Sequence, residues 1–202
     1  MLFEALAVSG ASLIKLERKP DPRGFFARTF CAREFADHGL PTDFVQASLS
    51  YNEHRGTVRG LHFQWPPSRE GKLVRCIRGA LVDVLLDLRP DSGSYLQHCA
   101  LELSAENGNA VYIPPGVAHG FQTLTGSTEV LYQMTDYFAP ELSTAVRWND
   151  PAFGIRWPLE EIVISERDAA CAPFDRGQFE TELAQHKGHA RSRCSDAPVH
   201  RN

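Results

Sequence analysis

Residues 80–88, ALVDVLLDL, alternate in a way that is typical of a β-strand. Successive side chains of a strand point to opposite sides. Val82, Val84 and Leu86 therefore share one face, while Asp83 and Asp87 lie on the other. One face is apolar and the other carries acids, so this run predicts a strand whose two sides have different surroundings.

The alternation extends through a long central region, from residue 44 to about residue 164. Its short apolar runs are separated by turn clusters at residues 51–53, 65–67, 89–93, 106–109 and 114–116. Strands at this spacing predict an all-β sandwich or barrel. His119 and Tyr132 also lie on the polar sides of their runs. Two arrangements explain this pattern equally well. In one the polar sides line the mouth of a barrel, and in the other they simply meet solvent.

The length of 202 residues indicates one domain, which we place at residues 1–185 with its barrel core at about 44–164. Residues 31–39 predict a short helix that ends at Gly39. Ser165 and Asp168 have the form of a capping box. A second short helix is predicted over 175–186, and the polar residues 186–202 predict a flexible C-terminal tail.

Charge and hydropathy exclude several kinds of partner. Lysine and arginine total 21 against 25 acidic residues, giving a net charge of −4 without a concentrated basic surface, so nucleic acid is not expected as a partner. The N-terminus lacks a cationic start, and Asp83 and Asp87 interrupt an apolar run that is too short to cross a membrane. We expect a soluble, cytoplasmic protein without membrane contact.

Residues 57–79, TVRGLHFQWPPSREGKLVRCIRG, concentrate groups that can carry chemistry. Arg59, Lys72 and Arg75 suit an anion site, with His62 as an acid or base near neutral pH. A solvent-facing strand pair remains the alternative. Strict alternation puts Arg59 and His62 on opposite faces, so they share a site only if a bulge or twist at Gly60 redirects one of them.

An ordered series of motifs resembles the dTDP-4-dehydrorhamnose 3,5-epimerase family. The motifs are RGFFARTF (23–30), VQASLSYN (45–52), RGLHFQ (59–64), KLVRCIRG (72–79), DLRP (87–90), LELSAEN (101–107), YIPPGVAHGFQTL (112–124), LYQMTDYFAPE (131–141), VRWNDPAFGIRWPL (146–159) and SERD (165–168). The resemblance implies a cupin-type jelly-roll β-barrel with short flanking helices, usually a homodimer. Its implied reaction is epimerisation at C3, C5 or both of a nucleotide-diphospho-4-keto-6-deoxyhexose in deoxysugar (rhamnose-type) biosynthesis, without a redox cofactor.

The same resemblance assigns roles to individual residues. It implies His62 as general base, Asp168 as the aspartate that holds it, Tyr132 as general acid on the opposite sugar face, and Lys72 near the keto oxygen. Positions expected around the substrate are Arg59, which matches a phosphate-contacting arginine, Gln46, His119, Arg23, Phe26, Arg28, Asn52 and Phe138. Asp83 matches the acidic partner of His119.

Two positions depart from the family pattern. Arg28 stands where relatives commonly carry a glutamate, often supplied by the partner subunit, that faces the thymine base. A guanidinium suits a base with an acceptor at N3, such as cytosine, which makes a CDP-sugar or another non-thymidine sugar an alternative substrate. Phe138 stands where relatives often have a tyrosine near the base.

Two further readings are a metal-dependent cupin enzyme and a non-catalytic sugar-binding cupin. The first usually needs two closely spaced histidines and a carboxylate, and Leu61-His62-Phe63 offers no His-x-His, so no metal site is expected. Against the second, binding alone would not require an acid together with a base.

Overall fold

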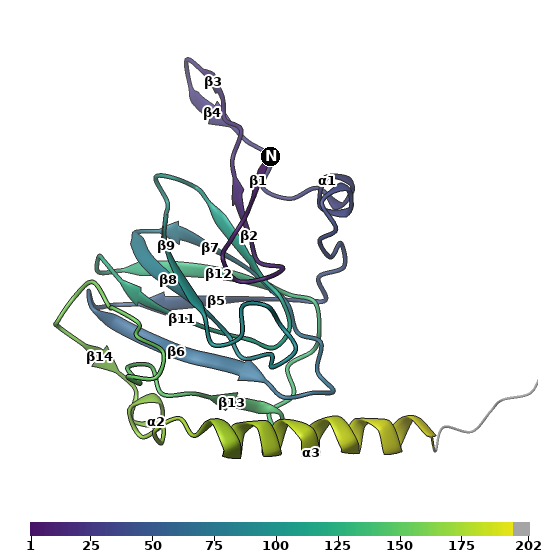
Figure 1. Ribbon diagram of the computed structural model, residues 1–202. Coiled ribbons are helices and arrows are strands. Elements are labelled where there is room, and N and C mark those ends of the chain that lie inside the picture. The colour runs from purple at the N-terminus through teal and green to yellow at the C-terminus, as the bar shows by residue number, and fades with distance from the viewer. Residues whose placement is uncertain (196–202) are drawn as a thin grey trace, which may run out of the picture.

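Two sheets that face each other make up most of the molecule (Figure 1). The computed structural model describes residues 1–195, with side chains through residue 188. The first sheet is antiparallel, and its strands are, in spatial order, β1 (Leu2–Ala5), β2 (Ser12–Lys15), β10 (Ala110–Ile113), β7 (Lys72–Arg78), β12 (Thr128–Met134) and β5 (Gln46–Asn52). The predicted all-β fold is therefore confirmed.

The second sheet has the order β13 (Ser143–Ala145), β6 (Thr57–Gln64), β11 (Val117–Thr123), β8 (Ala80–Asp87) and β9 (His98–Ser104), with β14 (Val163–Ile164) parallel to β6. Apolar side chains from both sheets meet in one core cluster, including Val74 and Val130 from the first and Leu85 and Phe121 from the second. Burial of this surface drives the two sheets together.

Strand β8 is buried on both sides. The sequence left open whether its acidic side faces solvent or the interior of the protein. Leu81 and Leu85 pack into the core between the sheets, while Val84 and Leu86 pack on the other side of β8. Asp83 lies on the inner side and is fully buried. The acidic side of this strand thus faces the interior of the barrel and not solvent.

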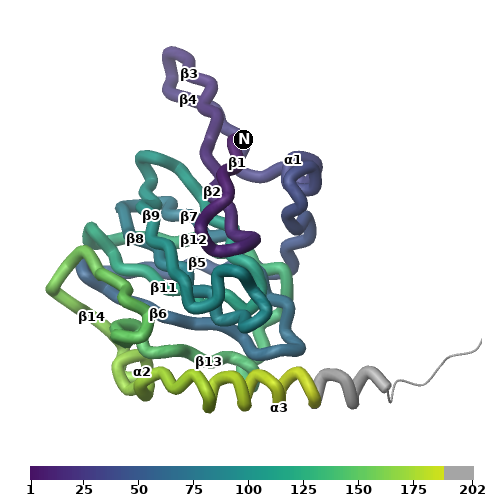
Figure 2. The backbone as a smooth tube through the Cα atoms, in the orientation of Figure 1, coloured from purple at the N-terminus to yellow at the C-terminus, as the bar shows by residue number. Residues whose placement is uncertain are grey.

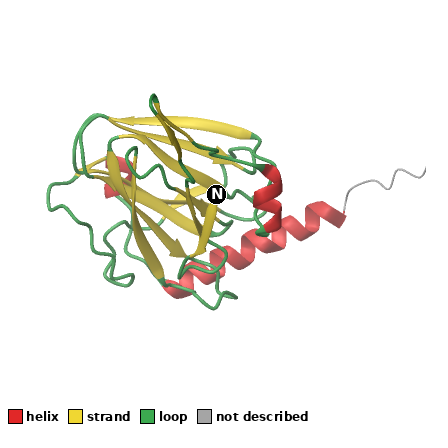
Figure 3. Cartoon of the chain, turned by 90° about the horizontal axis from the view of Figure 1, so that it is seen from above, coloured by secondary structure: helices red, strands yellow, loops and turns green. Residues whose placement is uncertain are grey.

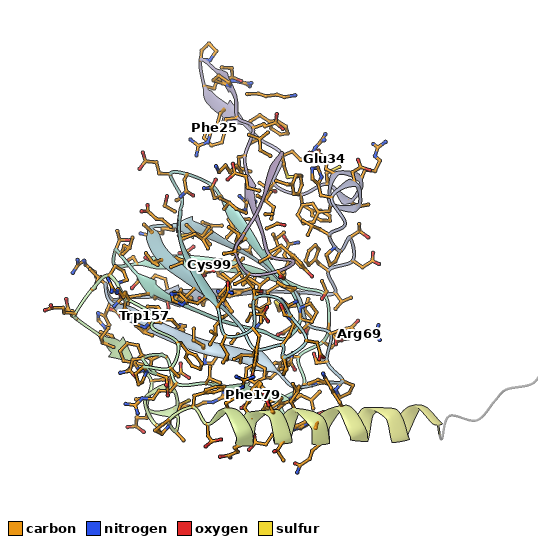
Figure 4. The ribbon with its side chains drawn as sticks, viewed as in Figure 1. Phe25, Glu34, Arg69, Cys99, Trp157 and Phe179 are labelled. Atoms are coloured by element: carbon orange, nitrogen blue, oxygen red, sulfur yellow. The ribbon has the colours of Figure 1, made fainter. Side chains whose placement is uncertain are left out.

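Helices lie around the barrel (Figure 3). The short helix α1 (Ala32–Asp37) matches its prediction, and Gly39 after it has a positive φ of 69°. Helix α2 (Glu166–Ala169) begins after Ser165. Helix α3 (Arg176–Ser195) runs along the second sheet, and Figure 4 shows Phe179 between the two. Phe179 packs with Phe63 of β6 and with Trp65, the residue after that strand.

Helix α3 differs from its prediction in length. We predicted a helix over 175–186 followed by a flexible tail, but the helix continues to Ser195. The reason is that the polar residues after 186 include alanine, lysine and arginine, which favour helix despite one glycine at position 188. Residues 196–202 of the predicted tail lie outside the described residues.

A two-stranded hairpin, β3 (Lys19–Asp21) and β4 (Gly24–Phe26), projects from the barrel (Figures 1 and 2). Its pairing is confined to these two strands, and Phe25 and Phe26 are largely exposed. Figure 4 shows Phe25 on this projection, distant from the sheets.

None of the helices described, α1 to α3, is long and apolar enough to cross a membrane.

A bulge at Gly60 changes the register between β6 and β11. His62 lies opposite His119, whereas Arg59 lies opposite Phe121, so the pairing shifts by one residue across Gly60. Gly60 has a φ of 137°, which residues with a side chain rarely adopt. The bulge that the sequence required for Arg59 and His62 to share a side is therefore confirmed.

Gly60→Ala is expected to lower the free energy of unfolding by about 2–4 kcal/mol. An added Cβ would lie 2.5 Å from the Cα of Gly120, and that neighbour is backbone, which cannot move aside cheaply. Chemical denaturation of both proteins measures the difference.

The matched control is Gly24→Ala, because Gly24 has a similar φ of 135° but nothing within 4 Å of an added Cβ. It should cost only the backbone strain, about 1 kcal/mol. Equal losses of stability in the two variants would show that the close approach of β6 and β11 does not exclude a side chain at position 60.

Candidate active site

A cavity of about 340 Å³ opens between the two sheets. Strands of both sheets supply its walls, and six of the residues expected from the sequence line it: Arg59, His62, Lys72, His119, Tyr132 and Phe138. The bulge at Gly60 brings Arg59 and His62 to the same cavity. The barrel with a polar-lined interior is thus the correct alternative, and the solvent-facing strand pair is not.

His62 and Asp168 form a hydrogen-bonded pair, with 2.8 Å between Nε2 and Oδ1. The Asp168 side chain is buried, while the His62 side chain is 38% exposed toward the cavity. When the neutral imidazole donates its Nε2 proton to the carboxylate, Nδ1 is the atom left to accept a proton. The expected pairing of His62 with Asp168 is therefore present, and it leaves the histidine with one free basic nitrogen.

Asp168 owes its position to the start of helix α2. The Ser165 hydroxyl accepts a hydrogen bond from the Asp168 backbone N–H at 3.2 Å, which is one half of the predicted capping box. The second half is absent from the hydrogen bonds of the described residues. Instead, the Asp168 carboxylate accepts from His62 and from the Gly60 N–H at 3.3 Å. Asp168 thereby connects the helix to both the bulge and the histidine.

Burial lowers the pKa of His62 below its ordinary value of 6.5, and Asp168 partly offsets this by favouring the charged ring. Lys72 and His119 lower it further through charge repulsion. The imidazole is therefore largely neutral at pH 7 and available to accept a proton.

Asp168→Asn should lower kcat by roughly 10²–10⁴-fold, because the ring loses the group that fixes its tautomer and stabilises the imidazolium. The wild-type rate should fall with acid at a midpoint below pH 6.5, since protonated His62 cannot act as a base. In the variant this midpoint should move lower still, because the carboxylate that raises the His62 pKa is gone. The pH profiles of kcat and kcat/KM measure the loss of rate and the shift of the midpoint. A midpoint that rises in the variant would contradict the assignment.

A second histidine–carboxylate pair borders the same cavity through His119. His119 Nε2 is 2.7 Å from Asp83 Oδ1, and both side chains are buried. Burial raises the pKa of Asp83 above its ordinary value, and His119 opposes that shift. Asp83 thus supports His119, as expected from the sequence.

Tyr132 and Lys72 come from the first sheet, across the cavity from the strand of His62. Burial raises the pKa of the Tyr132 phenol well above 10, an effect that a hydrogen bond with Ser50 partly offsets, so the phenol remains protonated at neutral pH. The Lys72 ammonium lies 3.1 Å from Glu70, and both side chains are mostly buried. The cavity therefore presents a proton donor and a cation opposite a base.

Asn52 does not line the cavity but holds a residue that does. It is buried, and its Oδ1 accepts from Arg59 Nε at 2.8 Å while its Nδ2 donates to the Thr128 carbonyl. Gln46, at the other end of the same strand β5, acts similarly, since its Oε1 accepts from the Phe138 N–H at 2.7 Å. In this chain both side chains orient cavity residues.

The structure does not bring Arg23, Phe26 and Arg28 into the cavity of their own chain. Arg23 lies on the projecting hairpin and pairs with Asp21, and the Phe26 ring is exposed. Arg28 follows the hairpin and pairs with Glu34 at 2.7 Å. Sequence position alone could not separate these three residues from the others.

Nine cavity residues were not among the sequence predictions: Ser48, Ser50, Phe63, Gln64, Glu70, Phe121, Met134, Ser143 and Arg167. Two of them carried a signal, since Gln64 shares its side of β6 with His62 and Arg167 directly precedes Asp168. Among the described side chains, no group of three or more histidines, cysteines and acids is arranged to hold a metal ion.

Comparisons with known proteins agree on one family. A family model described as dTDP-4-dehydrorhamnose 3,5-epimerase matches residues 5–176. An enzyme of that name from Sinorhizobium fredii is 41% identical over 171 residues, covering 84% of this chain and 88% of the relative.

Two solved structures show the same fold. The dTDP-4-dehydrorhamnose 3,5-epimerase of Elizabethkingia anophelis has a TM-score of 0.83 at 32% identity, covering 86% of this chain and 96% of that one. The dTDP-6-deoxy-D-glucose-3,5-epimerase of Legionella pneumophila, solved with dTDP-4-keto-L-rhamnose, has a TM-score of 0.82 at 33% identity, covering 90% and 96%. The predicted cupin-type jelly roll is confirmed.

Proposed function

Because the chain belongs to the dTDP-4-dehydrorhamnose 3,5-epimerase family, whose members are isomerases, we propose that it inverts C3, C5 or both of a dTDP-4-keto-6-deoxyhexose in deoxysugar biosynthesis. The observation that carries this proposal is the contents of one cavity. A neutral imidazole backed by a buried carboxylate faces a protonated phenol and an ammonium group. Inversion of a carbon beside a ketone is served by a base on one side, an acid on the other and a group that stabilises charge on oxygen, and the cavity contains all three.

A hydrogen on carbon next to a ketone can be removed because the charge left behind delocalises onto oxygen as an enolate. Nδ1 of His62 takes that proton, and Asp168 stabilises the imidazolium that forms. The Lys72 ammonium stabilises the enolate oxygen, an effect that is large where water is excluded. Tyr132 then delivers a proton from the other side of the ring, which inverts the centre.

The diphosphate is expected to meet the arginines of the cavity, Arg59 and Arg167. A guanidinium binds phosphate oxygens through two parallel hydrogen bonds, which favours arginine at such sites. The Arg59 side chain is held by Asn52 and the Tyr51 carbonyl, so its orientation is set before substrate arrives.

We take dTDP as the nucleotide because the curated relatives and the Legionella structure carry it in their names. A CDP-sugar is the alternative substrate, because Arg28 replaces a glutamate of the family pattern. In this chain its guanidinium pairs with Glu34, which neutralises part of the charge that would select another base.

The test is hydrogen exchange followed by NMR in heavy water, with dTDP-4-keto-6-deoxyglucose and separately with its CDP counterpart. Exchange at C3 or C5 with the dTDP sugar supports the proposal and identifies the carbon that is inverted. Faster exchange with the CDP sugar would assign the nucleotide differently. If neither sugar exchanges at either carbon, the proposed function is wrong.

We also propose that the working form is a homodimer in which the hairpin β3–β4 reaches the cavity of the partner subunit. Its support is the position of Arg23, Phe26 and Arg28, which the family resemblance assigns to the substrate site but which lie outside the cavity of their own chain. The exposed Phe25 and Phe26 rings offer apolar surface for such a contact. Sedimentation equilibrium tests this, and a monomer at concentrations that sustain full activity would exclude it.

A further inference from the structure

Gln64 stands at the end of β6, beside the catalytic centre. It follows His62 by two residues, so both side chains project from the same side of the strand. Both line the cavity between the sheets. Two residues along a strand span about 7 Å, which is within the width of one sugar ring and its substituents.

The oxygen of the Gln64 amide is already used. Oε1 accepts a hydrogen bond from the Ala139 N–H at 3.0 Å, and Gln46 accepts from the preceding N–H, that of Phe138. These two glutamines, one from each sheet, hold the segment that carries Phe138 at the cavity. The contact also fixes the orientation of the Gln64 amide, because a flipped amide would set its NH₂ group against the Ala139 N–H.

The nitrogen of the same amide has no hydrogen-bond partner among the side chains and backbone that the structure describes. The Gln64 side chain is buried, with a residue exposure of 7%, and Nε2 is one of two buried polar side-chain atoms left unpaired in the described part of the chain. Buried N–H donors are nearly always paired in folded proteins, since an unpaired one is destabilising. Because Gln64 lines the cavity, a bound ligand is the remaining source of an acceptor for this donor, which is buried and unpaired in the free protein.

We propose that Gln64 is a further substrate-binding residue, whose Nε2 donates a hydrogen bond to an oxygen of the sugar. A sugar oxygen fits better than a nucleotide oxygen, because Gln64 lies within one sugar's reach of the base that acts on the ring. The role rests on the proposed function, and it orients the ring so that the reacting carbon faces Nδ1 of His62.

Gln64→Glu tests this role with little change in shape. A carboxylate still accepts from the Ala139 N–H but cannot donate, so kcat/KM should fall about tenfold near pH 8, the size expected for one neutral hydrogen bond. As the pH is lowered, the ratio of variant to wild-type activity should rise, because a protonated glutamate donates through its O–H and burial favours that form. Affinity for dTDP alone should stay at the wild-type value, because dTDP contains no sugar of the substrate type.

Two variants separate this role from support of the 138–139 segment. Gln64→Met removes donor and acceptor together and should show the loss in kcat/KM without recovery at low pH. Gln46→Met removes the other contact to the segment but keeps the Gln64 donor, so its ratio to wild type should not rise as the pH falls. Thermal unfolding of each variant confirms that it is folded, and Gln64→Met decides the case if Gln64→Glu does not fold.

Three results would overturn the proposal. One is a Gln64→Glu enzyme with wild-type kcat/KM, which would show that the donor is not used. Another is an equal loss of dTDP affinity, which would place the acceptor on the nucleotide. The third is a loss that does not change with pH. A wild-type protein that exchanges no substrate hydrogen would instead overturn the proposed function, and this role with it.

Discussion

His62→Asn should lower the kcat of epimerisation by roughly 10²–10⁴-fold. The asparagine side chain has no nitrogen that accepts a proton. Among the described residues, no other histidine is hydrogen-bonded to Asp168. Because removal of the carbon-bound hydrogen is the first chemical step, its exchange with heavy water should be lost to the same extent as product formation. NMR of a single reaction mixture measures both.

The control for that result is His98→Asn. His98 lies on β9, outside the lining of the cavity, so the same substitution there should leave both rates near the wild-type value. Exchange that survives in His62→Asn at the wild-type rate would show that another base removes the proton, and His119 would be the first candidate because it lies directly opposite on β11.

Tyr132→Phe should separate exchange from inversion. The substitution removes the phenol that delivers a proton to the second side of the ring, so inversion should fall by roughly 10²–10³-fold. His62 remains able to take a proton and return it to the same side, so exchange with heavy water should continue. The ratio of exchange to inversion should therefore rise by about the factor by which inversion falls.

Phenylalanine at position 132 keeps the ring that packs near His119, so the variant is expected to fold. Ser50→Ala is a useful companion, because it keeps the phenol and removes its hydrogen bond with Ser50, together with a 3.4 Å hydrogen bond from Asn52, and it should have a much smaller effect. A parallel fall of exchange and inversion in Tyr132→Phe would mean that Tyr132 acts in binding the sugar and not as the acid.

Much of the fold was accessible from local sequence, because alternation and turn residues report directly on which side of a strand is buried. The run around Asp83 predicted two unlike sides, and the bulge at Gly60 followed from the requirement that Arg59 and His62 meet. What alternation could not supply was the depth of burial. Both sides of β8 are covered. The opposite sheet covers one side, and residues that include Phe153 and, from α3, Phe179 cover the other, so the burial depends on elements remote in sequence.

The site was less predictable where a side chain acts through a contact made at long range. From local pattern Asp168 matched only a capping box, and it was the family resemblance, not the pattern, that implied its pairing with His62, 106 positions earlier in the chain. Gln64 was visible in the motif, but its unpaired nitrogen exists only once the Ala139 N–H has engaged its oxygen. For the hairpin residues the motif match indicated a position near the substrate, but it could not indicate which subunit's cavity they would reach.

The close crossing of β6 and β11 has a consequence for attempts to change the specificity of this enzyme by directed evolution. Gly60 and Gly120 each leave no room for a side chain, since an added Cβ at either one would contact backbone at 2.5 or 2.6 Å. Mutant libraries gain little from randomising these two codons, because a side chain at either one destabilises the fold. Diversity is better placed at Ser48, Ser50 and Ser143, small side chains of the cavity wall that can be enlarged toward the ligand.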